Sequence, residues 1–424
     1  MRAIVVGAGI GGLTTALSLH AVGVQAWVFE AAPRIGASGL GINLQPGAVR
    51  ELDELGLLGH LAKVAAPIEV LAFFNRHGQE VWEEPRGSAC GYRWPQYAVN
   101  RGALQALLHE AACARLGRER VVTGHALAAF EQDEAGVVAH FADPASGARI
   151  RSERGDVLVG ADGLHSAVRR RFYPGQAPRF GGQLMWRGSS QGPAFLGGRA
   201  MVIAGHRDQK FVAYPMAPPR DGEVVLNWVA ELGKRGGAPQ REAWDRRVDK
   251  AVFAGRFAGW RFGWLDVPAV IDRAEVVLEF PKLDRDPVDR WSFGRVTLLG
   301  DAAHPMHPVG SQAGSQAILD ARVLAWHLAK GADDVPGALR AYEGDRLPVT
   351  RAIALRNRAM GAEVMMDLAE ARAPGGFADV EAVLPRRERE ERAAAYRTLS
   401  GLDVEDVNGR PSLSVRPASL PQPA

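Results

Sequence analysis

Residues 296–321 read VTLLGDAAHPMHPVGSQAGSQAILDA, and no other stretch says as much about the fold. An apolar run typical of a strand ends at Gly300-Asp301. His304, two prolines and a helix start rich in Gly, Ala and Ser follow it. Taken alone, the pattern predicts only a tight connection between a strand and a helix.

The N-terminal segment AIVVGAGIGGL, residues 3–13, gives this connection a partner. We expect a strand over residues 2–6 and a helix over residues 11–22, with a GxGxxG motif between them. Glycines there allow a tight turn and bring backbone N–H groups close to a pyrophosphate at the helix N-terminus. Glu30 ends the next expected strand, where a carboxylate accepts hydrogen bonds from a ribose. The order predicts a dinucleotide-binding unit whose glycines are Gly7, Gly9 and Gly12.

The composition limits the classes of function. The chain has 424 residues, 47% hydrophobic and 23% charged, as in ordinary soluble proteins. Its 51 basic residues form neither a basic stripe nor a nucleic-acid-binding motif, so we expect no nucleic-acid partner. Cys90 and Cys113 are too few for a disulfide framework. No apolar run reaches the roughly 18–20 residues of a membrane span, and Met1-Arg2 lead directly into a strand. We expect a cytoplasmic protein without a membrane partner, either a monomer or a homodimer.

The pattern of strands and helices predicts that the dinucleotide-binding fold is split along the chain. Its middle carries antiparallel-type strands separated by Gly, Pro and Asp, which we expect to form a sheet over the ligand, with a helix near residues 241–254. A Pro/Ser-rich tail is expected to be disordered. The expected parts are residues 1–179 for the first piece of the binding domain, 180–284 for the sheet domain, 285–400 for the second piece with C-terminal helices, and 401–424 for the tail.

Two further motifs lie between the ends of the split fold. Arg101 stands at a strand-to-helix junction, where it either caps the following helix in solvent or reaches a ligand. In VLVGADGLHSAVRR, residues 157–170, Asp162-Gly163 follow a buried strand and precede a helix. An acid at that point is either a helix N-cap or part of a ligand site, and the residues alone leave both open.

With Gly300-Asp301 added, this order of motifs resembles the group A FAD-dependent aromatic monooxygenases, the 4-hydroxybenzoate hydroxylase-like family, over roughly residues 1–360. The segments GINLQPGAV (41–49), MWRG (185–188) and GSQAILDA (314–321) are most similar to its 5-methylphenazine-1-carboxylate 1-monooxygenase branch. The resemblance implies an α/β fold: a Rossmann-type FAD-binding domain (three-layer ββα, GR2-like) with an inserted antiparallel β-sheet substrate domain and C-terminal helices.

The resemblance also implies that both ends of the chain hold FAD. The residue matching Asp301 binds the ribityl chain, the backbone after Pro308 faces the isoalloxazine, and Asp162 supports FAD and nicotinamide-nucleotide binding. Ala313-Gly314 invert the usual order of Gly and a small residue, so a loop that needed positive φ at residue 313 would have to shift. The implied FAD-binding residues are Gly7, Gly9, Gly12, Glu30, Gly41, Ile42, Arg101, Asp162, Gly300, Asp301, Pro308, Gly310 and Gly314.

The implied chemistry is hydroxylation of an aromatic or heteroaromatic, anionic, phenazine-like substrate by way of a C4a-hydroperoxyflavin, with or without decarboxylation. NADH or NADPH would supply the electrons, and dioxygen would supply the inserted oxygen atom. No second GxGxxG follows another strand, so we expect the nicotinamide to bind without a Rossmann domain of its own. The site must exclude water, which favours an apolar cavity with few polar anchors.

Strand alternation in the middle of the chain suggests the substrate wall. Leu184 and Trp186 point to one side, whereas Met185 and Arg187 point to the other. Arg187 would either pair with a substrate carboxylate or lie at the surface. Aromatic rings can stack on a planar substrate and Met can fill gaps, although each could equally be sheet core. The substrate candidates are Trp186, Tyr214, Met216 and Trp228.

No catalytic residue is certain from the sequence, and His307 and Tyr214 are the candidates. His304 and His307 could together suggest a metal-binding site. Prolines interrupt the helix that would align them, so we expect no metal. Two other functions stay open. WRFGWLDVP, residues 260–268, faintly resembles a halogenase signature but lacks its second Trp. A flavoprotein that sequesters a planar ligand would bind it without consuming NADH.

Overall fold

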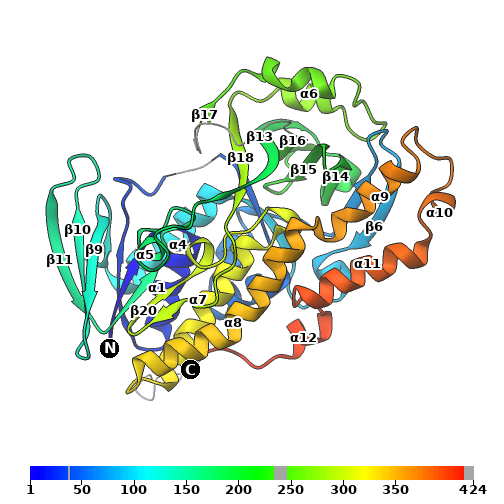
Figure 1. The fold of residues 1–424 in the computed structure, drawn as a ribbon. Helices are drawn as coiled ribbons and strands as arrows, with labels where there is room; N and C mark the ends of the chain where they lie inside the picture. The colour runs from blue at the N-terminus through cyan, green and yellow to red at the C-terminus, as the bar shows by residue number, and fades with distance from the viewer. Residues whose placement is uncertain (37–38, 234–245, 415–424) are drawn as a thin grey trace.

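The computed structural model describes residues 1–36, 39–233 and 246–414. Two large sheets organise these residues, with helices packed around them (Figure 1). The α/β fold class expected from the sequence is confirmed. None of the helices in the described ranges combines the length and the apolar character that a bilayer crossing requires.

The first sheet has six strands in the order β19-β20-β12-β1-β2-β8. Its four central strands are parallel neighbours, and their apolar runs are almost wholly buried because both faces of the sheet are covered. The strands are β1 (Arg2–Val6), β2 (Gln25–Phe29), β8 (Val121–Val122), β12 (Val157–Gly160), β19 (Ser292–Phe293) and β20 (Val296–Leu298).

Helices cover one face of this sheet and a meander covers the other, which makes three layers. The helices α1, α4 and α7 pack together over the sheet, while Val137, Ala139 and Phe141 of the meander join the same hydrophobic core. Figure 1 shows the meander at one end of the molecule. These layers contain α1 (Ile10–Ala21), α4 (Arg101–Leu116) and α7 (Ala313–Lys330), and β9 (Ala126–Gln132), β10 (Val137–Ala142) and β11 (Arg149–Gly155).

The second sheet has eight strands in the order β17-β18-β13-β16-β15-β14-β5-β6. All neighbours are antiparallel except β14 and β5, so the hairpin β5–β6, which precedes the inserted segment in sequence, extends its sheet. The strands are β5 (Val70–Phe74), β6 (Glu80–Pro85), β13 (Arg179–Pro193), β14 (Ala200–His206), β15 (Gln209–Pro215), β16 (Glu223–Gly233), β17 (Arg246–Arg247) and β18 (Val277–Asp284).

Smaller elements complete the structure. A three-stranded sheet of order β3-β7-β4 links the two large sheets. It consists of β3 (Gly41–Leu44), β4 (Ala65–Ile68) and β7 (Gln96–Asn100). The remaining helices are α2 (Pro46–Glu54), α3 (Leu58–Leu61), α5 (Ala167–Phe172), α6 (Val267–Asp272), α8 (Val335–Arg358), α9 (Val364–Arg372), α10 (Val380–Val383), α11 (Arg386–Leu399) and α12 (Val404–Gly409).

Two local expectations need correction. The helix expected near residues 241–254 is absent from its described part, which forms β17 and short 3-10 turns; residues 241–245 lie outside the described residues. Residues 401–414, expected to be disordered, include α12 and pack on the binding domain: Arg50 Nη1 donates to Val407 O at 2.8 Å, and Arg322 Nη2 donates to Ser414 Oγ at 2.8 Å. Buried basic side chains therefore hold this polar segment in place.

Candidate active site

Four of the predicted ligand groups follow four neighbouring parallel strands. Gly7 follows β1, Glu30 follows β2, Asp162 follows β12 and Asp301 follows β20. The carboxyl ends of parallel strands meet at one edge of a sheet, which is where open α/β sheets bind ligands. Three strand spacings separate β2 from β20, a span of roughly 14 Å. The two distant turns thus lie along one edge, and a dinucleotide could bridge them.

The glycine turn after β1 is built by close backbone packing. Gly7 has φ +102° and its N–H donates to Phe29 O at 2.7 Å. A Cβ on Gly12 would lie 1.9 Å from Gly7 O, so no side chain fits there. A Cβ on Gly9 would meet nothing within 4 Å and would fill open space at the start of α1. This opening fits a pyrophosphate approaching the helix N-terminus.

Glu30 is fixed beside this turn. Its Oε2 accepts the N–H of Ala8 at 2.7 Å, and its Oε1 accepts the N–H of Ala32 at 2.8 Å. Each carboxylate oxygen keeps a further lone pair, so the group can still accept hydrogen bonds from ribose hydroxyls. Gln105 of α4 donates to Ala8 O at 2.8 Å and braces the turn from the other side.

The second turn presents Asp301 at the same edge. Gly300 has φ +60°, and Asp301 is exposed, with no hydrogen bond or ion pair to its carboxylate among the described residues. A Cβ on Gly11 would lie 2.8 Å from Leu299 Cδ2, so α1 packs directly against the residue before Gly300. The free carboxylate and the nearby glycine turn fit the ribityl and diphosphate parts of FAD.

Asp162 lies just before α5. It accepts hydrogen bonds from Ser166 Oγ at 2.5 Å and from the N–H of Ala167 at 2.7 Å. Burial raises the pKa of Asp162, and the hydrogen bond from Ser166 opposes that shift. Ser166 rather than Asp162 is therefore the N-cap residue, and Asp162 supports it through these hydrogen bonds. A role of Asp162 in nucleotide binding stays a proposal.

Asn100 rather than Arg101 caps α4, because Asn100 Oδ1 accepts the N–H groups of Gly102 at 2.9 Å and Ala103 at 3.1 Å. The exposed side chain of Arg101 is free to face a ligand, and its N–H donates to Leu40 O at 2.8 Å.

The loop before α7 explains the Ala313-Gly314 order. The positive φ angles fall at Gly310 (+67°) and Ser311 (+54°), whereas Ala313 already begins the helix. A Cβ on Gly314 would lie 2.6 Å from Ile42 Cδ1, so Gly314 lets the side chain of Ile42 pack closely against the start of α7. No shift of the loop is needed. Pro308, by contrast, is exposed at the start of the loop.

Strand β3 joins this edge to the eight-stranded sheet. Gly41 N–H donates to Asn227 Oδ1 at 2.7 Å, and Arg187 Nη2 donates to Gly41 O at 2.9 Å. A Cβ on Gly41 would lie 2.7 Å from Tyr214 Cε2. At its other end, the N–H of Gln45 donates to Ser315 Oγ at 2.9 Å. We call the sheet face that carries Arg187, Tyr214 and Asn227 the inner face.

Two predicted substrate residues, Trp186 and Trp228, lie on the opposite, outer face, away from β3. Trp186 is 4% exposed and stacks on Phe253 with ring centroids 4.9 Å apart. Trp228 is completely buried and donates from Nε1 to Ser190 Oγ at 2.9 Å. Both rings belong to the core between the sheet and residues 250–274.

Tyr214 and Met216 lie on the inner face, and both are buried. They share a hydrophobic cluster with Met365 and Tyr396 of the C-terminal helices. Burial raises the pKa of Tyr214, while Arg187 opposes that shift. The two residues remain candidates on the inner face.

Sequence reasoning missed an apolar group around Arg187. The side chains on the strands next to Arg187 are Val229 and Leu278, and all three are partly exposed. Burial lowers the pKa of Arg187, whose Nε has no hydrogen-bond partner among the described residues. The alternation of side chains over residues 184–187 could have indicated this group, because it places Met185 and Arg187 on the other face of the strand from Trp186. The group consists of Leu40, Met185, Val229, Leu278 and Phe280.

His307 lies at the end of the same face. Its Nε2 is 3.5 Å from Asp284 Oδ2, and its ring packs against Gly181, where a Cβ would lie 2.7 Å away. Burial lowers the pKa of His307 to about 4, although Asp284 opposes the shift. His304 turns instead to Asp320, with Nε2 2.6 Å from Oδ2. The two histidines therefore have different carboxylate partners.

Buried ion pairs stiffen the inner face beyond His307. Lys210 Nζ lies 2.7 Å from Glu363 Oε2 and 3.2 Å from Glu231 Oε2, and Lys282 Nζ lies 3.1 Å from Glu231 Oε2. Burial raises the pKa of Glu231, but the two lysines outweigh it and lower that pKa to about 2. Glu231 is thus a fixed anion rather than an acid or base.

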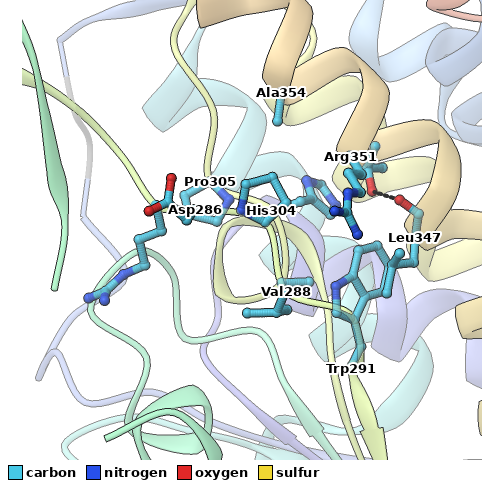
Figure 2. A pocket seen from close by; sticks show the side chains of 12 residues that line it. Asp286, Val288, Trp291, His304, Pro305, Leu347, Arg351 and Ala354 are labelled. Carbon is cyan, nitrogen blue, oxygen red and sulfur yellow. Dashed lines mark hydrogen bonds between the residues drawn. The ribbon is translucent and has the colours of Figure 1, made fainter. Parts of the chain in front are cut away.

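A small cavity behind His304 is not a substrate site. Figure 2 shows His304 and Trp291 at this cavity, with Leu347, Arg351 and Ala354 of α8 also lining it. It encloses about 10 Å³, which is room for a single water.

Comparison with known proteins agrees with this geometry. The family model described as FAD binding domain matches residues 1–252 and 275–357. The chain is 44% identical over 361 residues to phenazine 1,6-dicarboxylic acid hydroxylase of Lysobacter antibioticus (84% of this chain, 88% of that protein). It is 36% identical over 369 residues to 3-amino-4-hydroxybenzoate 2-monooxygenase of Streptomyces platensis (85% and 88%). The structure of Klebsiella pneumoniae HpxO complexed with FAD and uric acid is similar, with a TM-score of 0.73 at 25% identity over 96% of each chain.

Proposed function

The chain belongs to the FAD-binding-domain family and is an FAD-dependent aromatic monooxygenase, and we propose that it uses NADH or NADPH to hydroxylate a planar heteroaromatic acid of the phenazine type. Its own residues support this in three places: the dinucleotide edge, strand β3 and the inner face of the eight-stranded sheet.

The observation that carries the proposal is the position of Arg187. Its guanidinium donates to Gly41 O on β3, next to the cofactor edge, and it is surrounded by apolar side chains. A cation among apolar side chains suits a planar ring that bears a carboxylate. The two relatives support this choice, because phenazine 1,6-dicarboxylic acid and 3-amino-4-hydroxybenzoate are both aromatic acids.

When bound, FAD supplies the redox chemistry that activates dioxygen for hydroxylation. The chain would hold it through the turns at Gly7–Gly12 and Gly300–Asp301, with Glu30 on the ribose. Arg187 would orient the substrate carboxylate, and Val229 and Leu278 would exclude water beside it. His307, with its pKa lowered to about 4, would stay neutral near pH 7. We propose no general base. A ring carbon that carries a carboxylate would lose it on hydroxylation.

Neither alternative function gains support. The relatives compared above are a hydroxylase and a monooxygenase, and Trp260 and Trp264 of the halogenase-like segment pack in the outer core. Ligand sequestration without turnover is separated from hydroxylation by the experiment that follows.

The test is to reconstitute the protein with FAD and to measure substrate-stimulated oxidation of NADH and NADPH. Phenazine-1-carboxylate, phenazine-1,6-dicarboxylate, 3-hydroxybenzoate and unsubstituted phenazine form the panel, and product masses are recorded. We expect an acid to stimulate oxidation and to gain one oxygen atom. Stoichiometric hydrogen peroxide without an oxygenated product, for every acid, would refute the proposal.

The variant Arg187→Gln tests the carboxylate contact. Loss of a charge-assisted hydrogen bond should raise KM for the acids on the order of 10- to 100-fold. Binding of unsubstituted phenazine should change less than twofold. If the variant loses affinity equally for the acids and for unsubstituted phenazine, Arg187 does not bind the carboxylate.

A further inference from the structure

The turn Gly300–His304 is held from behind by two buried charges of opposite sign. We propose that Asp320 and Arg169 are positioning residues that fix this turn in the shape that presents Asp301 to FAD. The inference rests on the proposed role of Asp301 as an FAD ligand.

Asp320 holds both ends of the turn with one oxygen. It lies on α7 and is completely buried. Its Oδ2 accepts the N–H of Gly300 at 3.1 Å and lies 2.6 Å from His304 Nε2. The N–H of His304 donates to Gly300 O at 2.8 Å, which closes the turn. Of the residues between Gly300 and His304, Asp301 is exposed.

The other carboxylate oxygen of Asp320 is also bound. Its Oδ1 accepts from Arg346 Nε at 2.8 Å, and Arg346 Nη2 donates to Gln316 Oε1. Burial would raise the pKa of Asp320, but His304 and Arg346 lower it below its usual range. The anion that orients the turn is therefore maintained by α8 on one side and by the turn itself on the other.

Arg169 holds the middle of the turn from the opposite side. It is 2% exposed, and its Nη1 donates to Ala302 O at 2.8 Å and to Ala303 O at 2.7 Å. Its other nitrogens donate to Gln176 Oε1 and Asp286 O. These partners are all neutral oxygens. Because Arg169 belongs to α5, it ties the segment after β12 to the turn after β20.

A stabilising role alone does not account for this arrangement. Burying charges is costly, and apolar residues of similar volume often stabilise a fold as well or better. Here the buried charges grip the backbone at residues 300, 302 and 303, and the His304 side chain. Only the side chain of Asp301 is left without a described partner. The pattern fits a turn whose backbone must be exact for a ligand contact.

The same helix offers a matched control. Arg322, two residues after Asp320, forms an equally buried ion pair with Glu51, with Nε 2.9 Å from Oε2. This pair joins α7 to α2 and makes no contact with the turn. Its loss should cost stability without moving Asp301.

The test compares Asp320→Asn, Arg169→Lys and Glu51→Gln. The apoproteins are titrated with FAD, followed by quenching of flavin fluorescence, and their thermal midpoints are recorded. We expect Asp320→Asn and Arg169→Lys to weaken FAD binding on the order of 10- to 100-fold, as when residues that orient ligands from behind are changed. Glu51→Gln should change FAD affinity less than about twofold at a comparable loss of thermal midpoint.

Excess FAD should restore kcat in both positioning variants. Should Asp320→Asn fail to fold, Arg169→Lys carries the test alone, since it keeps the charge. Wild-type FAD affinity in the folded variants, or an equal loss in Glu51→Gln, would overturn the proposal. The titration contains neither substrate nor nicotinamide, so a failure of the proposed hydroxylation would leave this result unaffected.

Discussion

The six-stranded sheet carries its proposed ligand groups on turns at the ends of its strands, whereas the eight-stranded sheet carries them on side chains within its strands. At the first sheet, Gly7 and Gly12 meet with backbone atoms so close that no side chain fits. At the second, Arg187 and Tyr214 stand on one face of a sheet whose other face is core.

This difference decides what each region tolerates. A strand-end turn depends on backbone conformation, so small substitutions there should be severe and should act on the cofactor. The role of a residue in the sheet depends on which face its side chain occupies. Substitutions on the outer face should therefore lower stability, whereas substitutions on the inner face should also change substrate binding.

The largest effect is expected from Gly12→Ala. The new Cβ would lie 1.9 Å from Gly7 O, a backbone clash that should lower the free energy of unfolding by about 3 kcal/mol and abolish FAD binding. Gly9→Ala is the control, since a Cβ there meets nothing within 4 Å. It should change the unfolding free energy of the apoprotein by less than about 0.5 kcal/mol while weakening FAD binding. Equal stability losses, measured by denaturant unfolding, would contradict the turn geometry.

Asp301→Ala comes next. Asp301 is exposed, so its removal should leave the free energy of unfolding within about 0.5 kcal/mol of wild type. Loss of hydrogen bonds to a charged group should weaken FAD binding about 10- to 100-fold and give a pale purified protein. The FAD content per chain is the measurement. A yellow, fully loaded variant would place the ribityl contact elsewhere.

The contrast also explains how far the sequence could be read. Gly7, Gly12 and Glu30 were predictable because their requirements are local: a positive φ, a close approach and a strand end. Alternation correctly separated Met185 and Arg187 from Trp186. Which residues cover the outer face was not predictable, because the cover comes from residues 250–274, far along the chain.

The expectation of disorder for residues 401–414 was wrong for a related reason, and residues 415–424 of the expected tail lie outside the described residues. Its Pro/Ser-rich composition indicates disorder, yet Arg410 Nη2 pairs with Glu51 on α2, and Ser412 Oγ donates to Glu54 Oε2 at 2.7 Å. Such partners lie more than 350 positions away in the sequence. No local pattern reveals them.

His307 gives the third prediction, a pH effect at the sheet face. Its folded pKa of about 4 is below the ordinary 6.5, because burial and the nearby Lys282 and Arg358 disfavour the charged ring more than Asp284 favours it. Below pH 6.5 His307 is protonated in the unfolded chain, whereas in the folded chain it stays neutral down to about pH 4. The free energy of unfolding therefore falls as the pH falls from 6.5 to 4. Between pH 7 and 5 the wild type should lose about 2 kcal/mol relative to His307→Gln. Parallel stability curves of the two proteins would show that His307 is not the cause.

The smallest effect is expected from Trp186→Phe, which tests the assignment of faces directly. The variant loses the hydrogen bond from Trp186 Nε1 to Glu279 Oε2 (3.0 Å) in the outer core, so the free energy of unfolding should fall by about 1 kcal/mol. KM for the acid substrate should stay within about twofold of wild type, because the ring cannot reach the inner face. Val229→Ala is the matched variant on the inner face, beside Arg187. It should cost a similar stability but raise KM about threefold or more, since a partly exposed apolar wall is removed. If Trp186→Phe raises KM as much as Val229→Ala does, the substrate lies against the outer face, and the contrast between strand ends and sheet faces fails at its second half.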